Sequence, residues 1–375
     1  MKKLIILLVL LLCLSACSEQ KVQKDTTTIT DVRGREVAVP KKISKVYYPY
    51  YYENLLTIAG PDAFKKVIAS STYDTENYSK TFYQLLRDQS PGFKEMKDIG
   101  STLKDNFDIE QLIALKPDVA IFANYQYDAI GEDNINLLEQ SGIPVVFIDY
   151  TDLTPEAHTK STTIIGQLFS SEKRAQELND NYTAHVKKVK EAVAKIPDHK
   201  LKSAYFELRY NGPTFKEYGK TYGRHMLGLL AAEAGAKNIY EDKVKELGDV
   251  DPEYLFQQDP EAIFLDGGNY ADKNMKTIRT GYTISKQETN QSISQLVKAR
   301  PGFEELTAVK NRHVYALDND LMRTMKDYVL MEYIGKMLYP DYFKDFEPTK
   351  ELTVFNKKYL PQLPADSSFM TKWED

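Results

Sequence analysis

The stretch EKRAQELNDNYTAHVKKVKEAVAKI, residues Glu172–Ile196, decides the fold. Two serines, which are favoured helix N-cap residues, precede it, and Pro197 follows it. Its apolar residues recur at steps of three or four, at Leu178, Tyr182, Val186, Val189 and Val193. This pattern predicts one amphipathic helix of roughly 37 Å, at 1.5 Å per residue, which is too long for an ordinary crossover between two strands. On the pattern alone, a long surface helix is the alternative.

Two similar segments flank this helix. IEQLIALKPDVAIFA, residues 109–123, precedes it, and PEYLFQQDPEAIFLD, residues 252–266, follows it. When Glu110 is aligned with Glu253, the two segments match at three places. These are an apolar pair, a proline followed by an acidic residue, and a second apolar pair. Each copy therefore predicts a short helix, a break at the proline and a buried strand. Two copies on either side of a rigid helix predict two similar lobes held apart by a strut.

Strand and helix patterns alternate through both halves of the chain, which is typical of an α/β protein. The first half begins with a hairpin over 29–40 and then predicts these elements: strand 45–48, helix 53–59, strand 66–70, helix 109–115, strand 119–123, helix 129–141 and strand 145–148. A helix over 154–169 leads into the strut. The second half predicts strand 203–207, helix 224–234, strand 262–266, helix 292–298, strand 314–317 and helix 328–338. We expect an α/β fold of two Rossmann-like lobes with central β-sheets, joined by one long rigid α-helix, with a ligand cleft between the lobes.

The N-terminus indicates export. Lys2 and Lys3 precede the 11-residue apolar run Leu4–Leu14, which is typical of a secretory signal and too short to span a bilayer. LSAC, residues 14–17, resembles the bacterial lipobox, which implies cleavage before Cys17 and acylation of its thiol. An ordinary signal peptide with an incidental cysteine is the alternative. We therefore expect an extracytoplasmic lipoprotein held to a membrane, at the cell surface or in the periplasm.

Charge and length limit the remaining possibilities. Removal of the signal takes the net charge from −5 to −7, which argues against nucleic acid as a partner. About 345 residues then remain after a polar tether, which is enough for two domains. We predict a signal peptide over 1–16, a lipidated tether over 17–28, an N-terminal lobe over 29–153, a connecting helical region over 154–197, a C-terminal lobe over 198–345 and a tail over 346–375.

Several motifs resemble one known family. They are DVRGREVAVP (31–40), YYPYYYENLLTIAG (47–60), DIEQLIALKPDVAIFA (108–123), GIPVVFID (142–149) and RPGFEELTAVKNRHVYALD (300–318). The chain resembles the solute-binding lipoproteins of ABC transporters of the helical-backbone type, which deliver iron-siderophores, haem or cobalamin. The resemblance covers roughly residues 29–345. It departs from the family around Pro49, where small residues are replaced by Tyr47, Tyr48, Tyr50, Tyr51 and Tyr52.

Ligands of open α/β sheets bind beyond the carboxyl ends of the strands. In the first lobe these positions carry many tyrosines, which offer a flat apolar face and a polar tip. In the second lobe they carry arginines, whose forked donors suit anionic groups. We therefore predict a cleft with an aromatic wall and a cationic wall, formed by Tyr50, Tyr73, Tyr125, Arg209, Tyr222, Arg224, His225 and Arg323.

An anionic ferric chelate fits such a cleft best, because rings contact the organic shell and guanidinium groups offset its charge. A tyrosine phenolate or His225 is a possible direct iron ligand, and His225 or Met226 a possible axial ligand of haem. Cobalamin is a further possible ligand. We expect no intrinsic cofactor and no resident metal: the iron complex is cargo.

The family resemblance implies that paired glutamates meet arginines of a permease dimer with its ATPase, and Glu110 and Glu253 occupy the matching positions. The sequence lacks a G-x-S-x-G elbow, an H-E-x-x-H motif and a P-loop, so we do not expect an enzyme. We expect a monomeric binding protein. A sensor input domain, a surface adhesin and a lipid-anchored enzyme are the alternatives from other classes.

Overall fold

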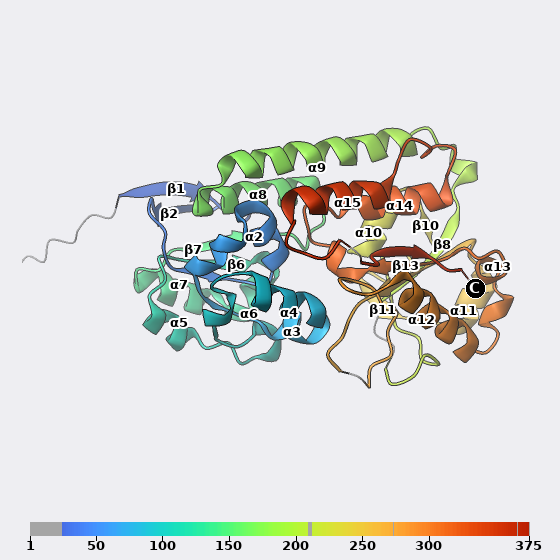
Figure 1. Cartoon of the computed structure of the whole chain (residues 1–375), viewed down its shortest axis with the longest axis horizontal. Helices are drawn as coiled ribbons and strands as arrows, with labels where there is room; N and C mark the ends of the chain where they lie inside the picture. Colours follow the sequence, from blue (N-terminus) through green and yellow to red (C-terminus); the bar gives the residue numbers. More distant parts are fainter. Residues whose placement is uncertain (1–24, 209–211, 273, 366, 375) are drawn as a thin grey trace, which may run out of the picture.

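The computed structural model describes residues 25–208, 212–272, 274–365 and 367–374. It contains two α/β lobes side by side, with one long helix lying along both of them (Figure 1). This arrangement confirms the fold class predicted from the sequence.

The N-terminal lobe is built on a parallel sheet in the order β5-β4-β3-β6-β7. Its strands are β3 (Val46–Tyr48), β4 (Val67–Ser70), β5 (Lys97–Asp98), β6 (Val119–Ala123) and β7 (Val145–Ile148). Every residue of β3, β6 and β7 is buried, as expected for strands covered by helices on both faces. The helices are α2 (Tyr52–Ala59), α3 (Tyr73–Tyr78), α4 (Lys80–Gln89), α5 (Ile109–Leu115), α6 (Tyr127–Ile130) and α7 (Glu132–Gln140).

Two antiparallel helices connect the lobes. α8 (Pro155–Phe169) ends at Ser170 in a left-handed conformation, and α9 (Glu172–Val193) returns along it. The helices approach closely at Gly166, where a Cβ would lie 2.6 Å from the Cβ of Ala175. All but the last three residues of the predicted strut are helical, and Ala194–Ile196 form a turn before Pro197.

Buried polar contacts fix the strut to the C-terminal lobe. Tyr182 on α9 donates a hydrogen bond of 2.9 Å to one oxygen of Asp327, and His158 on α8 lies 3.0 Å from the other oxygen. All three side chains are buried. Asp327 precedes α14 (Tyr328–Leu338), so both connecting helices are tied to one position of the second lobe.

The C-terminal lobe has a sheet in the order β11-β9-β8-β12-β13-β14, with β10 also paired to β8. Its strands are β8 (Ser203–Glu207), β9 (Lys220–Tyr222), β10 (Lys237–Asn238), β11 (Leu247–Asp249), β12 (Ala262–Gly267), β13 (Val314–Asp318) and β14 (Met370–Lys372). β8, β10, β12 and β13 run parallel, whereas β9, β11 and β14 pair with their neighbours in antiparallel fashion. The helices are α10 (Leu227–Glu233), α11 (Pro252–Gln258), α12 (Lys286–Ala299), α13 (Thr307–Lys310), α14 and α15 (Pro348–Tyr359).

Two of the predicted boundaries differ from the elements of the structure. After residue 345, where we expect a short helix and a tail, α15 buries Leu352 and Phe355, β14 extends the sheet, and Trp373 is packed into the lobe. The tether does not reach residue 28, because β1 (Thr26–Thr30) pairs with β2 (Glu36–Pro40). Threonines favour a strand, and a polar strand with few apolar residues resembles a tether in sequence.

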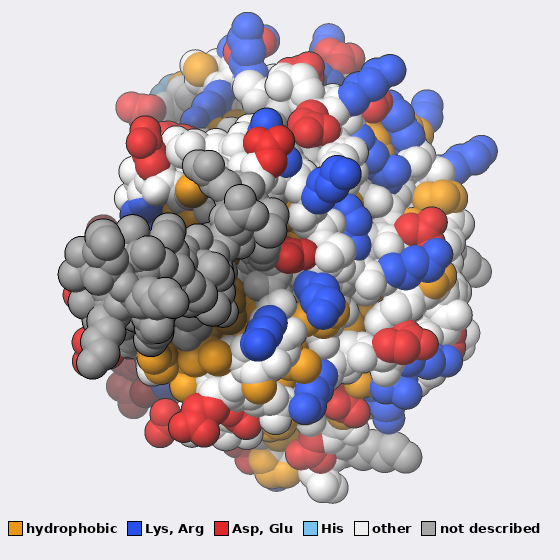
Figure 2. Space-filling view, turned by 90° about the vertical axis from the view of Figure 1, so that its left-hand side faces the viewer, with side chains coloured by type: hydrophobic (Ala, Val, Ile, Leu, Met, Phe, Trp, Pro, Cys, Tyr) orange, Lys and Arg blue, Asp and Glu red, His pale blue; other side chains and the backbone are white. Residues whose placement is uncertain are grey.

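The described part of the chain contains no helix with the length and apolar character needed to span a bilayer. The signal segment and Cys17 lie outside the described residues. On the end of the molecule that carries the N-terminal lobe, lysine and arginine side chains lie interspersed with acidic ones (Figure 2).

A buried ion pair stabilises the second lobe. Arg300 donates two hydrogen bonds, of 2.6 and 2.5 Å, to the carboxylate of Glu207 at the end of β8, and it also donates to the carbonyls of Phe215 and Glu217. Burial alone would raise the pKa of the Glu207 carboxyl, but the charge and hydrogen bonds of Arg300 hold it below its ordinary value. The pair therefore fixes both ends of the loop that leads from β8 to β9.

We predict that Glu207→Gln lowers the free energy of unfolding by about 3–5 kcal/mol at neutral pH, because Arg300 would be left with an unpaired buried charge. Urea denaturation measures this loss. Because the pKa of Glu207 is lowered in the folded protein, the stability that its charge contributes is present above the ordinary value of 4.5 and is lost as the pH falls through the folded pKa. The difference between the two proteins should therefore shrink in acid. Glu177→Gln, which removes an exposed ion pair with Lys358, is the matched control and should change little.

Candidate functional site

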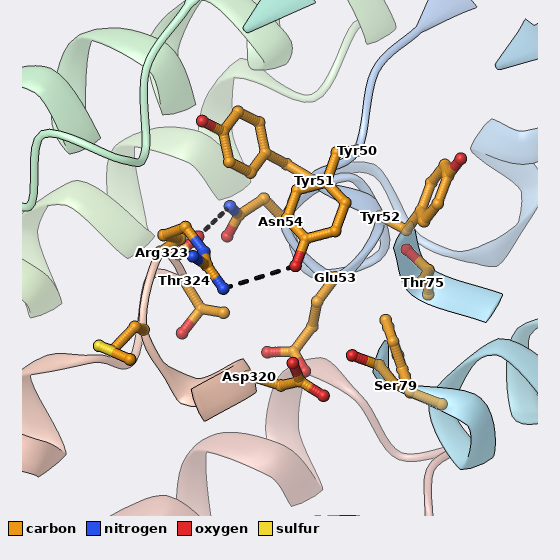
Figure 3. Close-up of a pocket in the computed structure, with 12 residues that line it drawn as sticks. Tyr50, Tyr51, Tyr52, Glu53, Asn54, Thr75, Ser79, Asp320, Arg323 and Thr324 are labelled. Carbon is orange, nitrogen blue, oxygen red and sulfur yellow. Dashed lines mark hydrogen bonds between the residues drawn. The ribbon is translucent and has the colours of Figure 1, made fainter. Parts of the chain in front are cut away.

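A pocket lies between the two lobes where strand ends from both sheets meet (Figure 3). We call it the cleft pocket. The N-terminal lobe contributes residues that follow β3 and residues of α3 and α4, and the C-terminal lobe contributes the segment that follows β13. Its lining residues are Tyr50, Tyr51, Tyr52, Glu53, Asn54, Thr75, Ser79, Phe82, Asp320, Met322, Arg323 and Thr324. The prediction that a cleft forms at the carboxyl ends of the strands agrees with this placement.

A tight turn after β3 sets the position of Tyr50. The amide of Tyr52 donates a hydrogen bond of 2.8 Å to the carbonyl of Tyr50, and Tyr51 between them has φ −77° and ψ 58°. These are the angles of an inverse γ-turn. The turn leaves Tyr50 half-buried at the pocket, whereas the side chains of Tyr51 and Tyr52 turn into the lobe.

The other tyrosines of this stretch are core residues. Tyr47, Tyr48, Tyr51 and Tyr52 are at most 3% exposed, and the Tyr51 and Tyr52 hydroxyls bond to Thr151 and Ser70. Burial raises the pKa of Tyr51 and Tyr52, so these phenols stay protonated at neutral pH. The tyrosine-rich departure from the family pattern therefore changes the packing of the lobe more than it changes the cleft.

Arg323 is the counterpart of Tyr50 on the second lobe. Its guanidinium carbon lies 5.6 Å from the centre of the Tyr50 ring, and Nη2 lies 3.5 Å from the Tyr50 hydroxyl. The same Nη2 donates a hydrogen bond of 2.9 Å to Oδ1 of Asn319. One aromatic face and one cation, each from a different lobe, thus meet across the pocket, as the sequence predicts for these two residues.

A chain of hydrogen bonds within the C-terminal lobe holds the Arg323 guanidinium, and Tyr222 is part of this chain. Tyr222 is fully buried and donates to Oδ2 of Asp266, which also accepts a bond of 2.6 Å from Asn319. Asn319 in turn accepts the bond from Arg323. Tyr222, which the sequence predicts as a ligand contact, therefore does not line the cleft pocket, because its side chain is buried and bonded to Asp266.

A buried ion pair joins the lobes beneath the pocket. Glu53 on α2 and Lys326 on the second lobe lie 2.8 Å apart, and their side chains are 9% and 0% exposed. Tyr282 donates a hydrogen bond of 2.9 Å to the other oxygen of Glu53, and Phe82 stacks on the ring of Tyr282. Glu53 lies in a motif that resembles the family, whereas nothing near Lys326 or Tyr282 in sequence indicates a partner more than 200 residues away.

The lobes also meet along α3 and α4. The amide of Lys80 donates to the carbonyl of Asn269, and the amide of Ala271 donates to the carbonyl of Asn77, at 3.0 and 2.8 Å. Tyr78 and Tyr270 pack edge to face across the same contact, with ring centres 5.6 Å apart. The segment that follows β12 is therefore bound to the first lobe, which closes one side of the cleft.

The remaining predicted site residues that the structure describes lie outside the cleft pocket. Tyr73 is the first residue of α3, and the Nζ of Lys104 lies 4.7 Å from the centre of its ring. Tyr125 follows β6 and is 37% exposed. Arg224 is 57% exposed and paired with Glu241 at 2.8 Å and Glu233 at 3.9 Å, and Glu233 also binds Lys190 on the strut. Arg224 therefore belongs to the strut side of the second lobe.

His225 follows Arg224 in the turn before α10, and neither residue lines the cleft pocket. Arg209 lies outside the described residues. The prediction of a cationic wall made of three arginines is therefore not met among the described residues, where Arg323 lines the pocket and Arg224 does not. Sequence spacing could not separate them, because both follow a strand.

The cleft pocket has a volume of about 40 Å³, which is room for a water molecule or one small polar group. Among the described residues, no group of three or more His, Cys, Asp or Glu side chains is arranged to hold a metal ion. The pocket does offer the Tyr50 hydroxyl, the Arg323 guanidinium and the hydroxyls of Thr75 and Ser79, which are suited to a polar or charged small molecule.

Glu110 and Glu253 are exposed in the first turns of α5 and α11, which have matching local structure. Asp108 caps one helix and Asp251 the other, and both helices end at a residue in a left-handed conformation. Both helices lie away from the strut, one in each lobe (Figure 1). The internal repeat therefore places one carboxylate in the same local setting on each lobe.

A family model described as periplasmic binding protein matches residues 47–321. The chain belongs to this family. A Bacillus subtilis protein described as an uncharacterized ABC transporter substrate-binding lipoprotein, YvrC, is 24% identical over 88% of this chain and 90% of its own length. The molybdate-binding protein MolA of Haemophilus influenzae is 22% identical over the same shares of the two chains.

Among solved structures, the TroA-like periplasmic binding protein FepB of Veillonella parvula has a TM-score of 0.85 and 28% identity, and the match covers 92% of this chain and 99% of that one. The periplasmic binding protein described here is thus a substrate-binding component of an ABC transporter of the TroA-like type. Its ligand is not given by these similarities, because the name of MolA refers to molybdate, whereas IsdE of Staphylococcus aureus, 23% identical over 60% of this chain and 68% of its own length, is described as a heme uptake system protein.

Proposed function

We propose that this protein captures a ferric complex of an organic chelator outside the cytoplasm and delivers it to the membrane permease of its transporter. The observation that supports this ligand is the meeting of Tyr50 and Arg323 across the cleft. A ring and a guanidinium suit a ligand with aromatic or conjugated oxygen donors and negative charge. Tyr73 and Lys104 form a second pair of a ring and a cation, and both residues belong to the N-terminal lobe.

The size of the cleft pocket places a condition on this proposal. Sites for organic ligands usually measure about 300–1,000 Å³, whereas this pocket measures about 40 Å³. Binding of a chelate therefore requires the loops that border the cleft to move apart. Such motion would break the contacts of Asn269 and Ala271 with the first lobe before it affects the cores.

The same small volume favours a second candidate, a tetrahedral oxyanion such as molybdate. An oxyanion would need donors, which Arg323 and the pocket hydroxyls supply, but Glu53 and Asp320 line the same pocket and would repel it. Haem is not favoured, because His225 and Met226 lie in the turn before α10 and do not line the pocket.

We predict that Arg323→Ala weakens binding of a ferric tris-catecholate complex about tenfold or more, because a charged hydrogen bond contributes about 1.5–3 kcal/mol. Tyr50→Ala should also weaken binding, because the aromatic contact is lost. Quenching of the intrinsic fluorescence, titrated in parallel with molybdate and with haemin, measures the three affinities. Arg224→Ala is the matched control, since it removes the same side chain from outside the cleft, and it should bind like the native protein.

Two results would contradict the chelate proposal. One is tight binding of molybdate alone, with Arg323→Ala abolishing it, which would assign the site to an oxyanion. The other is a loss of chelate binding in Arg224→Ala that equals the loss in Arg323→Ala, which would place the ligand on another face.

We further propose that Glu110 and Glu253 dock the protein on the permease, one glutamate on each lobe. Both are exposed, and both lie outside the cleft pocket. Charges at the rim of an interface chiefly govern the rate and orientation of encounter. Their matched placement on the two lobes suits a partner made of two similar subunits.

We predict that the double variant Glu110→Ala, Glu253→Ala keeps its ligand affinity and stability but fails to support uptake, and that lysine at both positions is worse because it adds repulsion. Uptake by cells and affinity of the purified protein are the paired measurements. Glu191→Ala, an exposed glutamate on the strut, is the control and should transport normally. Normal uptake by the double alanine variant would show that these glutamates are ordinary surface residues.

The anchor is a separate proposal, supported by the lipobox-like LSAC at residues 14–17. We predict that Cys17→Ala releases the protein from the membrane fraction or leaves the signal uncleaved. Cell fractionation followed by mass spectrometry of the N-terminal peptide distinguishes these outcomes. An unmodified Cys17 in mature, membrane-bound protein would rule out the acyl anchor.

A further inference from the structure

Arg323 has an unusual backbone conformation for a residue that faces the cleft. Its φ is +66°, in the left-handed region that glycine adopts freely and that residues with a Cβ rarely adopt. Such conformations persist only where surrounding contacts impose them, and they cluster at functional sites. Contacts around Arg323 therefore hold its backbone in the left-handed conformation.

The backbone of this segment is bound across the lobe interface by Asn54 on α2. Its side-chain Nδ2 donates a hydrogen bond of 2.7 Å to the carbonyl oxygen of Arg323 (Figure 3). Its Oδ1 accepts a bond of 3.3 Å from the amide of Met325. Asn54 is 1% exposed, so one buried amide holds the backbone on both sides of Thr324.

Two further contacts of this segment lie within the second lobe. The Arg323 guanidinium binds Asn319, and the Thr324 hydroxyl donates to the carbonyl of Leu321 at 2.6 Å. These contacts would survive a separation of the lobes, whereas the two bonds of Asn54 would not. Next to Asn54 on α2, Glu53 holds Lys326 by the buried ion pair, so the same two lobes are held together immediately beside this contact.

We propose that Asn54 is a positioning residue, which holds Arg323 in its left-handed conformation and thereby directs the guanidinium across the cleft toward Tyr50. The role of Arg323 in ligand recognition rests on the function proposed above. Because Asn54 belongs to one lobe and Arg323 to the other, the positioning exists only while the lobes are together. Parting of the lobes releases the strained residue and withdraws the cation from the ligand.

A comparison of glycine and alanine at position 323 tests the positioning without any ligand. At a left-handed residue, R323G should be more stable than R323A, with an unfolding equilibrium constant roughly threefold to tenfold smaller. The same pair is then measured in the N54A background by urea denaturation. If Asn54 imposes the conformation, the advantage of R323G over R323A should disappear there, because the segment relaxes to a right-handed conformation.

Two further variants keep this test decisive. T57A removes a buried side chain one turn along the same helix and should leave the advantage of R323G unchanged. If N54A does not fold, N54D keeps the acceptor for Met325 and removes the donor to Arg323, and the same loss of advantage is expected. An equal advantage of R323G in the native and in the altered backgrounds would overturn the proposal.

Ligand binding separates this proposal from the proposed function. With the ferric tris-catecholate complex as probe, N54A should weaken binding about as much as R323A, roughly tenfold, and should add nothing in the R323A background. If the stability comparison shows the coupling but R323A binds the probe normally, the positioning stands and the assigned ligand contact fails. If N54A weakens binding equally in the presence and absence of Arg323, Asn54 acts on the ligand by another route and the positioning is overturned.

Discussion

The ion pair between Glu53 and Lys326 is the contact on which the cleft depends, because it sets the distance between two lobes that share no sheet. Both charges are buried, so each is costly without the other. Tyr282 donates a hydrogen bond to Glu53, and Lys326 donates one to Asn356 on α15, at 2.9 Å each, and these bonds favour one geometry of the pair. Tyr50 and Arg323 meet directly beside this pair, so their approach follows from it.

The strut provides the second constraint. A continuous helix, tied to Asp327 through Tyr182, does not permit the free hinge rotation that flexible strands allow. Relative motion of the lobes is thereby limited to small rotations about the strut, with larger shifts of the loops that border the cleft. The contacts of Asn269 and Ala271 with the first lobe, in contrast, involve loop and helix-end backbone and a hydrogen bond between the side chains of Asn269 and Thr81. A ligand would displace these contacts of Asn269 and Ala271 rather than the ion pair.

Local patterns predicted most of the fold and only part of the site. Strands 119–123, 145–148 and 203–207 and helices 109–115 and 328–338 have the predicted bounds, because their signals are contiguous apolar runs between clear breaks. The helix predicted over 129–141 is interrupted at Gly131, and α3 and α4 were missed because their sequences are polar and rich in tyrosine.

For the site, the rule that ligands bind beyond strand ends identified Tyr50 and Arg323. The same rule also selected Tyr222 and Arg224, because it gives the end of the sheet but not the direction of a side chain. Asn54 and Lys326 were out of reach, since their roles depend on partners from the other lobe.

The polar contacts across the lobe interface have a consequence for transport. An apolar interface would cost about 25 cal/mol for each Å² that is exposed on opening, and nothing in water would offset that cost. Hydrogen bonds and charges behave differently, because water replaces the lost partners and returns the hydration that burial removed. Glu53, Lys326 and Asn54 therefore give a closed state of defined geometry at a small net cost of opening. This balance suits a binding protein that must hold its cargo in solution and part its lobes on a membrane partner.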